Sequence, residues 1–432
     1  MTVLTADVAI IGAGIVGCSI ARSMSQAGFS TLNVDVLPAA GFGSTSHSSA
    51  IVRPFYSHPT ACALAHASRF RWLDWRSFLG GPQQESYASY HELGGWILVM
   101  EGEWGDYADN LKAMDSVGIG WEQLDCRSLL ARFPGLSVER FGPPVAYTHP
   151  RFGTPVAGSL AGAIHIPAAG HVNDPQLAAR NLQLAAVSSG ARFLFKQRVT
   201  HQRTANGRAA GLILESGTEI HAPVVVNASG PHSSVLNRMA GIEDFLRIKT
   251  RPQRHEVAYV RKPVSLGEGG VGFLADLDSG FYARSDGDDL LIGTTDPACD
   301  PPQVVEPDDV DLNLTNHWTT QVLRAAQRLE GLAVEGRARG TVGVYDVSDD
   351  WIPLYDKSPL AGFYLAIGTS GNQFKNAPYV GDLMLAIIRH ELAGNDHDQS
   401  PAALWLDEVQ RSINLGFYSR NREVQATRSV LA

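Results

Sequence analysis

The sequence predicts an α/β fold with two parts: a parallel-sheet unit assembled from distant segments, and a smaller α+β unit with a mainly antiparallel sheet. Three observations support this prediction. Residues 6–35 read as strand, glycine turn, helix and second strand. Residues 366–378, AIGTSGNQFKNAP, read as another strand, glycine turn and helix. Residues 256–263 and 280–293 read as antiparallel strands, with a hairpin turn at DGDD, residues 286–289.

Composition excludes several classes of protein. A chain of 432 residues is long enough for two or three packed units. The formal net charge of −9 gives no electrostatic reason to bind nucleic acid or an anionic membrane. The four cysteines are far apart and match no zinc spacing, which favours a reducing compartment and no metal site. No apolar run is long enough to span a bilayer, so we expect the protein in the cytoplasm.

The first glycine turn has the pattern of a Rossmann-like dinucleotide site. A short apolar strand at residues 8–11 leads into Gly12, Gly14 and Gly17, the G-x-G-x-x-G turn. The first glycine permits the sharp turn, the second lets the backbone approach a pyrophosphate, and the third allows close packing of helix on strand. The second strand ends at Asp35, where an acid can hold a ribose hydroxyl. No arginine follows nearby, which argues against NADP.

The segment after this unit favours FAD over NAD. Residues 37–59 form a loop rich in glycine and serine, followed by Arg53 among apolar residues. A nicotinamide-binding domain would normally continue into another regular strand–helix unit. A loop of small residues instead suits a chain that runs along an extended cofactor.

The other elements follow in chain order. Helices are expected over 60–80 and 311–329. A helix and strand are expected over 175–195, and a hairpin and strand over 211–230.

Six motifs together carry a resemblance to a known family. They are GAGIVG (12–17), GSTSHSSAIVR (43–53), GHVNDP (170–175), QRVTHQR (197–203), VVVNASGP (224–231) and the segment 349–378. In this order they resemble the FAD-dependent amine oxidoreductases of the D-amino-acid-oxidase superfamily. The sarcosine and dimethylglycine oxidoreductase branch and glycine oxidase are the most similar members. The motifs are specific to the family and much less specific to a substrate.

The resemblance implies a discontinuous Rossmann-like FAD-binding domain and a substrate-binding domain. The FAD-binding domain would comprise residues 1–90, 150–230 and 335–395; the substrate-binding domain would comprise 91–149 and 231–334, and 396–432 would be a C-terminal tail. The residues expected to contact FAD are Gly12, Gly14, Ile15, Val16, Gly17, Asp35, Ser44, Thr45, Ser46, His47, Ser49, Val199, Ala228, Gly230, Gly343, Gly371, Asn372, Gln373, Phe374 and Lys375.

The reaction that the resemblance implies is hydride transfer from a carbon bearing an amine to N5 of FAD, after which the imine hydrolyses. Arg53 and Lys375 match residues that bind the substrate carboxylate in this branch. For Arg53 the alternative role is a structural ion pair with an acidic residue. For Lys375 it is a solvated lysine on the first turn of a helix. Tyr282 and Tyr345 fall near aromatic active-site positions, where core packing is the alternative. Trp351 could also wall the pocket, and His255 is interpreted as structural.

The chain departs from the family pattern at several positions. Asp35 stands where glutamate is more common, and Asn372-Gln373 replaces a histidine–glycine pair. Gly343 replaces a cysteine that is joined to flavin in monomeric sarcosine oxidases. His47 matches a flavin-linked histidine of dimethylglycine dehydrogenases, but its neighbours differ, so noncovalent FAD is expected. Leu291 replaces a lysine that assists the reaction with oxygen, so oxygen should be a poor electron acceptor.

The sequence leaves two other functions open. One is an FAD-dependent 2-hydroxy acid or glycerol-phosphate dehydrogenase on the same fold. The other is a flavin-binding assembly protein without turnover. The electron acceptor, whether oxygen, a protein or a quinone, also stays open, as do the substrate side chain and the oligomeric state.

Overall fold

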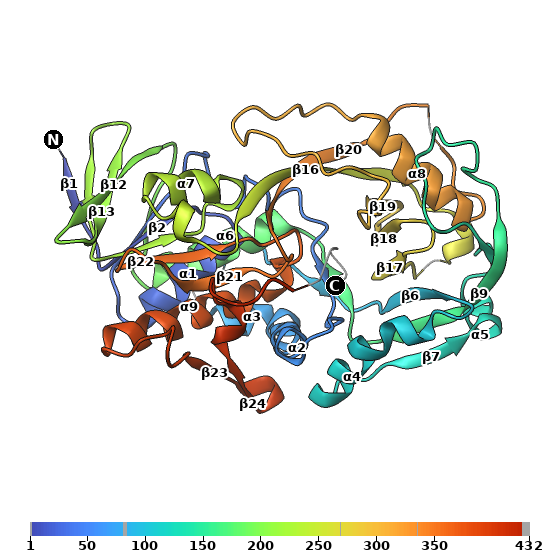
Figure 1. Ribbon diagram of the computed structural model, residues 1–432, viewed down its shortest axis with the longest axis horizontal. Coiled ribbons are helices and arrows are strands. Elements are labelled where there is room, and N and C mark those ends of the chain that lie inside the picture. Colours follow the sequence, from blue (N-terminus) through green and yellow to red (C-terminus); the bar gives the residue numbers. More distant parts are fainter. Residues whose placement is uncertain (1, 81–83, 268, 335, 426–432) are drawn as a thin grey trace.

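The computed structural model describes residues 2–80, 84–267, 269–334 and 336–425, and these form two lobes (Figure 1). One lobe contains the sheet-and-helix unit that opens with the first glycine turn. The other lobe contains the large sheet. The long strands β16 (Thr250–Arg261) and β20 (Gly340–Ser348) pair with each other and run between the lobes.

A six-stranded sheet forms the centre of the first lobe. Its strand order is β11 (Arg192–Leu194), β3 (Thr31–Val34), β2 (Val8–Ile11), β15 (Val224–Asn227), β22 (Phe363–Ile367) and β21 (Leu354–Lys357). All neighbours are parallel except the last pair. The sheet therefore draws strands from three distant parts of the sequence, as the predicted discontinuous domain requires.

Both faces of this sheet are covered, which explains why its central strands are apolar throughout. Val8 and Ile10 pack on one face, in a core that includes α1 (Ile15–Gln26), α6 (Pro175–Ser188) and α9 (Ala377–Leu392). Ala9 and Ile11 pack on the other face. A four-stranded sheet covers that second face, in the order β1 (Val3–Thr5), β14 (Glu219–His221), β13 (Arg208–Leu214) and β12 (Val199–Ala205).

The large sheet of the second lobe is mainly antiparallel, as predicted. Its order is β20, β16, β19 (Asp289–Thr294), β18 (Phe281–Asp286), β17 (Phe273–Asp276), β6 (Gly95–Met100), β9 (Val156–Ile166) and β7 (Glu122–Asp125), with β8 (Glu139–Arg140) paired to β9. Only β17 and β6 are parallel among these described strands. The strands β18 and β19 leave residues 287–288 as their turn, at the predicted position.

The remaining elements connect the two lobes or cover them. They are α2 (Pro59–Leu73), α3 (Trp75–Leu79), α4 (Ala108–Val117), α5 (Cys126–Arg132), α7 (Ser233–Met239), α8 (Asn316–Arg328), the three-stranded sheet β4 (Ile51–Val52), β10 (Gly170–Val172) and β5 (Tyr90–His91), and the hairpin β23 (Ala403–Leu406) and β24 (Arg411–Asn414). No helix within the described ranges is both long and apolar enough to cross a membrane.

The expected start of a helix at residue 311 is wrong. Helix α8 begins at Asn316, because Thr315 caps it: its hydroxyl accepts a hydrogen bond from the His317 N–H at 3.1 Å. The buried carboxylate of Glu256 accepts from the N–H groups of Thr315 and Trp318 as well. A cap supplied by a distant strand leaves no local signal in the sequence.

The proposed domain limits differ from the strand pairing in two places. Strands β9 and β20 pair within the large sheet, although their residues fall in segments assigned to FAD binding. The division at 90, 150, 230 and 335 stays a prediction. The C-terminal segment returns to the first lobe, where Arg420 contacts Asp356 at 3.0 Å and Asp398 at 2.6 Å.

Candidate active site

The first glycine turn is built so that only glycine fits at two of its positions. Gly12 has a φ of +113°, and a Cβ there would lie 2.3 Å from the Ala228 carbonyl oxygen. A Cβ on Gly17 would lie 2.2 Å from the Gly12 carbonyl oxygen. Helix α1 follows with Gly14 as its N-cap, which offers no side chain to cap the first N–H groups. This is the arrangement in which a helix N-terminus receives a pyrophosphate.

Asp35 fixes the same turn from the end of β3. Its carboxylate accepts hydrogen bonds from the Ala13 N–H at 2.6 Å and the Leu37 N–H at 2.8 Å. Burial raises the pKa of Asp35, and these two amide hydrogen bonds oppose that shift. From the sequence we predicted that Asp35 contacts a ribose, but not that its carboxylate binds the backbone of the glycine turn. The ribose contact stays a prediction.

The loop of small residues lies along β20, in the crossing between the lobes. The Thr45 hydroxyl accepts from the Ile15 N–H at 3.1 Å, and the Ser44 hydroxyl donates to the Val344 carbonyl at 2.6 Å. His47 lies against Gly343, where an added Cβ would be 3.0 Å from the histidine Cβ. The two positions that carry covalent flavin links in different branches are therefore neighbours here.

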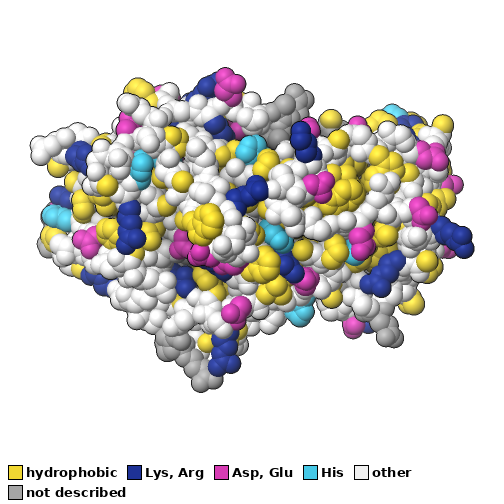
Figure 2. Space-filling view, turned by 90° about the horizontal axis from the view of Figure 1, so that it is seen from below, with side chains coloured by type: hydrophobic (Ala, Val, Ile, Leu, Met, Phe, Trp, Pro, Cys, Tyr) yellow, Lys and Arg dark blue, Asp and Glu magenta, His cyan; other side chains and the backbone are white. Residues whose placement is uncertain are grey.

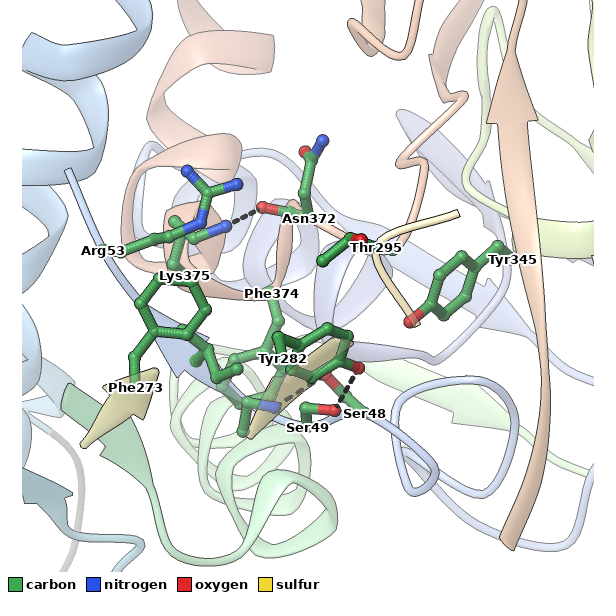
Figure 3. A pocket seen from close by; sticks show the side chains of 13 residues that line it. Ser48, Ser49, Arg53, Phe273, Tyr282, Thr295, Tyr345, Asn372, Phe374 and Lys375 are labelled. Carbon is green, nitrogen blue, oxygen red and sulfur yellow. Dashed lines mark hydrogen bonds between the residues drawn. The ribbon is translucent and has the colours of Figure 1, made fainter. Parts of the chain in front are cut away.

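A pocket brings together all four predicted catalytic residues (Figure 3). It is lined by Ser48, Ser49, Ala50, Ile51, Arg53, Phe273, Tyr282, Thr295, Tyr345, Gly371, Asn372, Phe374 and Lys375. Five of the predicted FAD-contacting residues line it as well: Ser49, Gly371, Asn372, Phe374 and Lys375. Val199 lies elsewhere, on β12. The roles of these residues stay predictions.

Lys375 is buried on the pocket wall, with only 3% of its surface exposed. It lies in a 3₁₀ turn, Phe374–Asn376, directly before α9. Its ammonium donates to the Tyr56 hydroxyl at 3.0 Å and to the Asn372 carbonyl. Burial lowers the pKa of Lys375 well below its usual value, and the nearby charge of Arg53 lowers it further. The alternative of a solvated lysine is wrong.

Arg53 follows β4 and is 2% exposed. Its guanidinium donates to the Phe55 carbonyl and lies 4.9 Å from the ring centroid of Tyr56. Burial lowers the pKa of Arg53. Figure 3 shows Arg53 and Lys375 together at one side of the pocket, with Tyr345 at the other. Two cations held so close in a buried place favour an anion between or beside them.

The rings of Tyr282 and Tyr345 each pack against a glycine, Gly293 and Gly371, that leaves room for the ring. A Cβ on Gly293 would be 2.3 Å from Cζ of Tyr282, and one on Gly371 would be 2.2 Å from the ring of Tyr345. The Tyr282 hydroxyl is 2.8 Å from the Ser49 hydroxyl. The Tyr345 ring stacks on His255 with centroids 4.0 Å apart. Both phenols therefore have fixed positions on the pocket wall.

Several lining residues had no signal in the sequence, among them Phe273 and Thr295. They reach the pocket through the pairing of the large sheet, which the sequence does not specify. Trp351 lines a neighbouring pocket instead, together with Tyr56 and Asn372. Within the described part of the chain, no group of histidine, cysteine and acidic residues could hold a metal ion.

The chain matches the family described as DAO, FAD dependent oxidoreductase, over residues 7–387, and it belongs to that family. It is therefore an FAD-dependent oxidoreductase, as the motifs predicted. It is 24% identical over 398 residues to sarcosine oxidase subunit beta of Rhodobacter capsulatus, covering 88% of this chain and 84% of the relative. It is 28% identical over 239 residues to glycine oxidase of Geobacillus kaustophilus, covering 54% of this chain and 58% of that relative.

Solved structures show the same fold. Glycine oxidase from Geobacillus kaustophilus superposes with a TM-score of 0.71 at 22% identity, covering 98% of this chain and 100% of that one. L-proline dehydrogenase from P. horikoshii superposes with a TM-score of 0.74 at 19% identity, covering 96% of this chain and 97% of that one. The glycine cradle, the uncapped start of α1 and the acid at the end of β3 all fit the dinucleotide that this family uses.

Proposed function

We propose that this protein oxidises the C–N bond of an amino acid or an N-alkyl amino acid by hydride transfer to N5 of FAD, giving an imine that hydrolyses. The observation that carries the proposal is the pair of buried cations, Arg53 and Lys375, on one wall of the pocket. The relatives named sarcosine oxidase subunit beta and glycine oxidase support it, because sarcosine and glycine each carry an amine and a carboxylate.

Binding of the substrate carboxylate is the main task of these side chains. The planar guanidinium of Arg53 offers two parallel donors that match a carboxylate, and Lys375 adds a point charge. A carboxylate held at that wall fixes the position of the α-carbon, which is what a hydride transfer requires of the protein. Tyr282 and Tyr345 limit the space around it. FAD supplies the acceptor for the two electrons.

We expect FAD to be noncovalent. The Nδ1 atom of His47 lies 2.6 Å from the Thr341 hydroxyl, so this ring already has a partner on β20. Gly343 offers no thiol. After acid precipitation, flavin should stay in the supernatant, and flavin mass on the protein would contradict this.

An anaerobic screen tests the function. Purified holoenzyme is mixed with amino acids and N-methyl amino acids, and bleaching of the visible absorbance of the flavin is followed. At least one of these compounds should bleach the flavin. Bleaching only by 2-hydroxy acids or glycerol phosphate would favour the dehydrogenase alternative. No bleaching by any of them would favour a flavin-binding assembly protein.

The electron acceptor can be measured with the same preparation. Leu291 is 1% exposed and belongs to an apolar cluster, so it offers no charge to stabilise reduced oxygen. Arg284 is buried beside Ser49, but it is paired with Asp286 at 2.9 Å. Oxygen should therefore be slower than an artificial dye, a quinone or a protein acceptor. Reoxidation in air as fast as turnover would contradict this.

A further inference from the structure

An acidic residue lies next to the pocket, away from the two cations. Asp296 directly follows Thr295, which lines the pocket. Figure 3 shows Tyr345 on the side opposite Arg53 and Lys375, with Thr295 between them. His255 stacks on Tyr345, and Asp296 lies 3.8 Å from His255. The pocket thus has two basic side chains on one side and Tyr345 on the other, with an acid beyond Tyr345.

Asp296 is held in an unusual backbone conformation. Its φ is +53°, in the left-handed region, and its N–H donates to the Thr294 hydroxyl at 2.9 Å. One carboxylate oxygen is 3.8 Å from Nδ1 of His255, which is too far for a hydrogen bond. The other oxygen is buried and has no hydrogen-bond partner among the residues described. Burial raises the pKa of Asp296 to about 7, and the charge of Asp300 contributes.

The groups around Asp296 do not neutralise it. Burial lowers the pKa of His255 to about 3, so this ring is uncharged at neutral pH. Asp300 is bound to Arg324, with one contact of 3.0 Å, so that cation is already paired. Beyond His255, burial lowers the pKa of His317 too.

Arg254 directly precedes His255 in the chain. It forms an ion pair of 2.6 Å with the buried Glu256. Its charge is therefore compensated within the large sheet. Among the described residues, neither Arg324 nor Arg254 forms an ion pair with the carboxylate of Asp296.

The charge of Asp296 acts on the pocket itself. Burial raises the pKa of Tyr282, and the charge of Asp296 is among the other causes. Burial, Tyr282 and then Asp296 raise the pKa of Tyr345. His255, which lies beside Asp296, also stacks on Tyr345. Both phenols line the pocket, so a cation in the pocket would experience the same charge.

We propose that Asp296 is a specificity-determining residue that selects substrates with a protonated amino group. The inference rests on the proposed function for the carboxylate end, where Arg53 and Lys375 bind. A zwitterion placed with its carboxylate at those cations has its ammonium group nearer Asp296. An ionised Asp296 stabilises that ammonium group when the ligand binds and disfavours a ligand with an apolar group in its place. The ammonium group then releases its proton to solvent, and the neutral amine transfers hydride.

The preference should depend on pH. Asp296 is protonated below about 7 and ionised above it. The preference for the zwitterion should therefore be present above that pH and lost below it. Tyr282 and Tyr345 stay protonated throughout, because their pKa values are raised. His255 stays neutral.

Two ligands of similar shape isolate this effect. 2-Aminoisobutyrate and pivalate differ in an ammonium group against a methyl group, and neither has the α-hydrogen that oxidation requires. Both share the carboxylate, so the ratio of their dissociation constants cancels the contributions of Arg53 and Lys375. At about pH 8.5, above the pKa of Asp296, the wild-type holoenzyme should bind 2-aminoisobutyrate about tenfold more tightly than pivalate, because the ionised carboxylate attracts the ammonium group. Titration calorimetry measures both constants.

Asp296→Asn should reduce this ratio to within about threefold and remove its pH dependence. Asparagine tolerates the left-handed backbone, so this variant should fold. Asp296→Glu should restore part of the ratio. Asp288→Asn is the matched control, because Asp288 is an exposed acid whose side chain is 81% accessible. It should keep the wild-type ratio.

The outcomes separate this inference from the proposed function. A ratio unchanged in Asp296→Asn, a ratio that does not fall with pH in the wild type, or no detectable binding of 2-aminoisobutyrate would each overturn the inference. If amino acids bleach the flavin and Asp296→Asn keeps the ratio, only this inference fails. If no amino acid bleaches the flavin but the ratio behaves as expected, the proposed function fails and the selection of zwitterions stands.

Discussion

Two cations are almost equally buried in this protein, and their surroundings are opposite in kind. Arg328 on α8 is 0% exposed and Lys375 is 3% exposed. The guanidinium of Arg328 contacts Asp276 at 2.7 Å and Asp278 at 3.0 Å. It also donates to the carbonyls of Ser137 and Glu139 at 2.6 and 2.7 Å. Among the described residues, the ammonium of Lys375 contacts two neutral oxygens, those of Tyr56 and Asn372.

This difference distinguishes a cation that holds the fold from one that is available to a ligand. A buried charge is costly unless an opposite charge and hydrogen bonds compensate it. The second lobe supplies that compensation to Arg328 from β17 and the residues after it, and from carbonyls at and just before the start of β8. The pocket supplies no carboxylate to Lys375 among the described residues, and the lowered pKa of Lys375 expresses that cost. A bound carboxylate would remove it.

The largest expected effect is the loss of stability when Arg328, the compensated cation, is replaced. Arg328→Met leaves Asp276 buried without its cation and leaves Asp278 with Arg140 at 3.7 Å, which should lower the free energy of unfolding by about 3–5 kcal/mol. Urea unfolding of the holoenzyme measures this. Arg261→Met is the control, because Arg261 forms an exposed pair with Asp288 and should change the value by less than about 1 kcal/mol. Equal stability of Arg328→Met and wild type would break the comparison.

Arg53→Met should have the next largest effect, and on activity. The lost carboxylate contact is worth about 1.5–3 kcal/mol, which is about 10- to 150-fold in kcat/KM. The loss should reach at least that size, because a misplaced α-carbon also slows hydride transfer. The measurement is anaerobic flavin reduction by the best amino acid of the screen. FAD content should stay near normal, and wild-type efficiency in this variant would refute the carboxylate site.

Lys375→Met sharpens the comparison with Arg328. It keeps the aliphatic length and removes the charge, and kcat/KM should fall by about 10- to 150-fold. The free energy of unfolding should not fall, because an uncompensated buried charge is removed. An amino acid amide should be handled equally by variant and wild type.

The control for this substitution is Lys249→Met, whose lysine is 48% exposed in the first lobe. It should retain both activity and stability. A large loss of stability in Lys375→Met with unchanged kcat/KM would assign Lys375 to the fold instead.

The part of the fold that the sequence predicted depends on local requirements. The glycine turn needs glycine at Gly12 and Gly17 for reasons of space. Strand β2 accordingly has its expected limits, and β3 ends one residue before Asp35. The start of α8 depends on Glu256 from a distant strand, and sequence patterns contain no such contact. Tertiary capping of this kind overrides local propensity.

The candidate site also contains residues that local motifs predict and residues that only the pairing of distant strands brings there. Arg53 and Lys375 lie in loops whose motifs are continuous in sequence, so each could be recognised separately. Phe273 and Thr295 reach the pocket because β17 pairs with β6 and β18 pairs with β19. Strand register sets which side chain faces the pocket, and a shift of one residue reverses it. Asp296 has a further requirement, a left-handed backbone at the end of β19, which no sequence pattern signalled.

The smallest expected effect is stabilisation by a simple carboxylate. Acetate at about ten times its dissociation constant should stabilise the wild-type holoenzyme by about 1.4 kcal/mol, which raises Tm by about 1–2 °C in a chain of this size. Differential scanning fluorimetry against chloride of the same ionic strength measures the shift. Burial and Arg53 lower the pKa of Lys375, so binding an anion takes up a proton and the shift should shrink as pH rises.

The variants Arg328→Met and Lys375→Met should differ in the Tm shift that acetate produces. Arg328→Met should lower Tm but keep the acetate shift, because its pocket is intact. Lys375→Met should keep Tm and lose most of the shift. If acetate stabilises Lys375→Met as much as wild type, the anion does not bind at Lys375, and burial of this lysine without a carboxylate has another cause. If Arg328→Met alone loses the shift, the compensated cation is the one that the ligand needs.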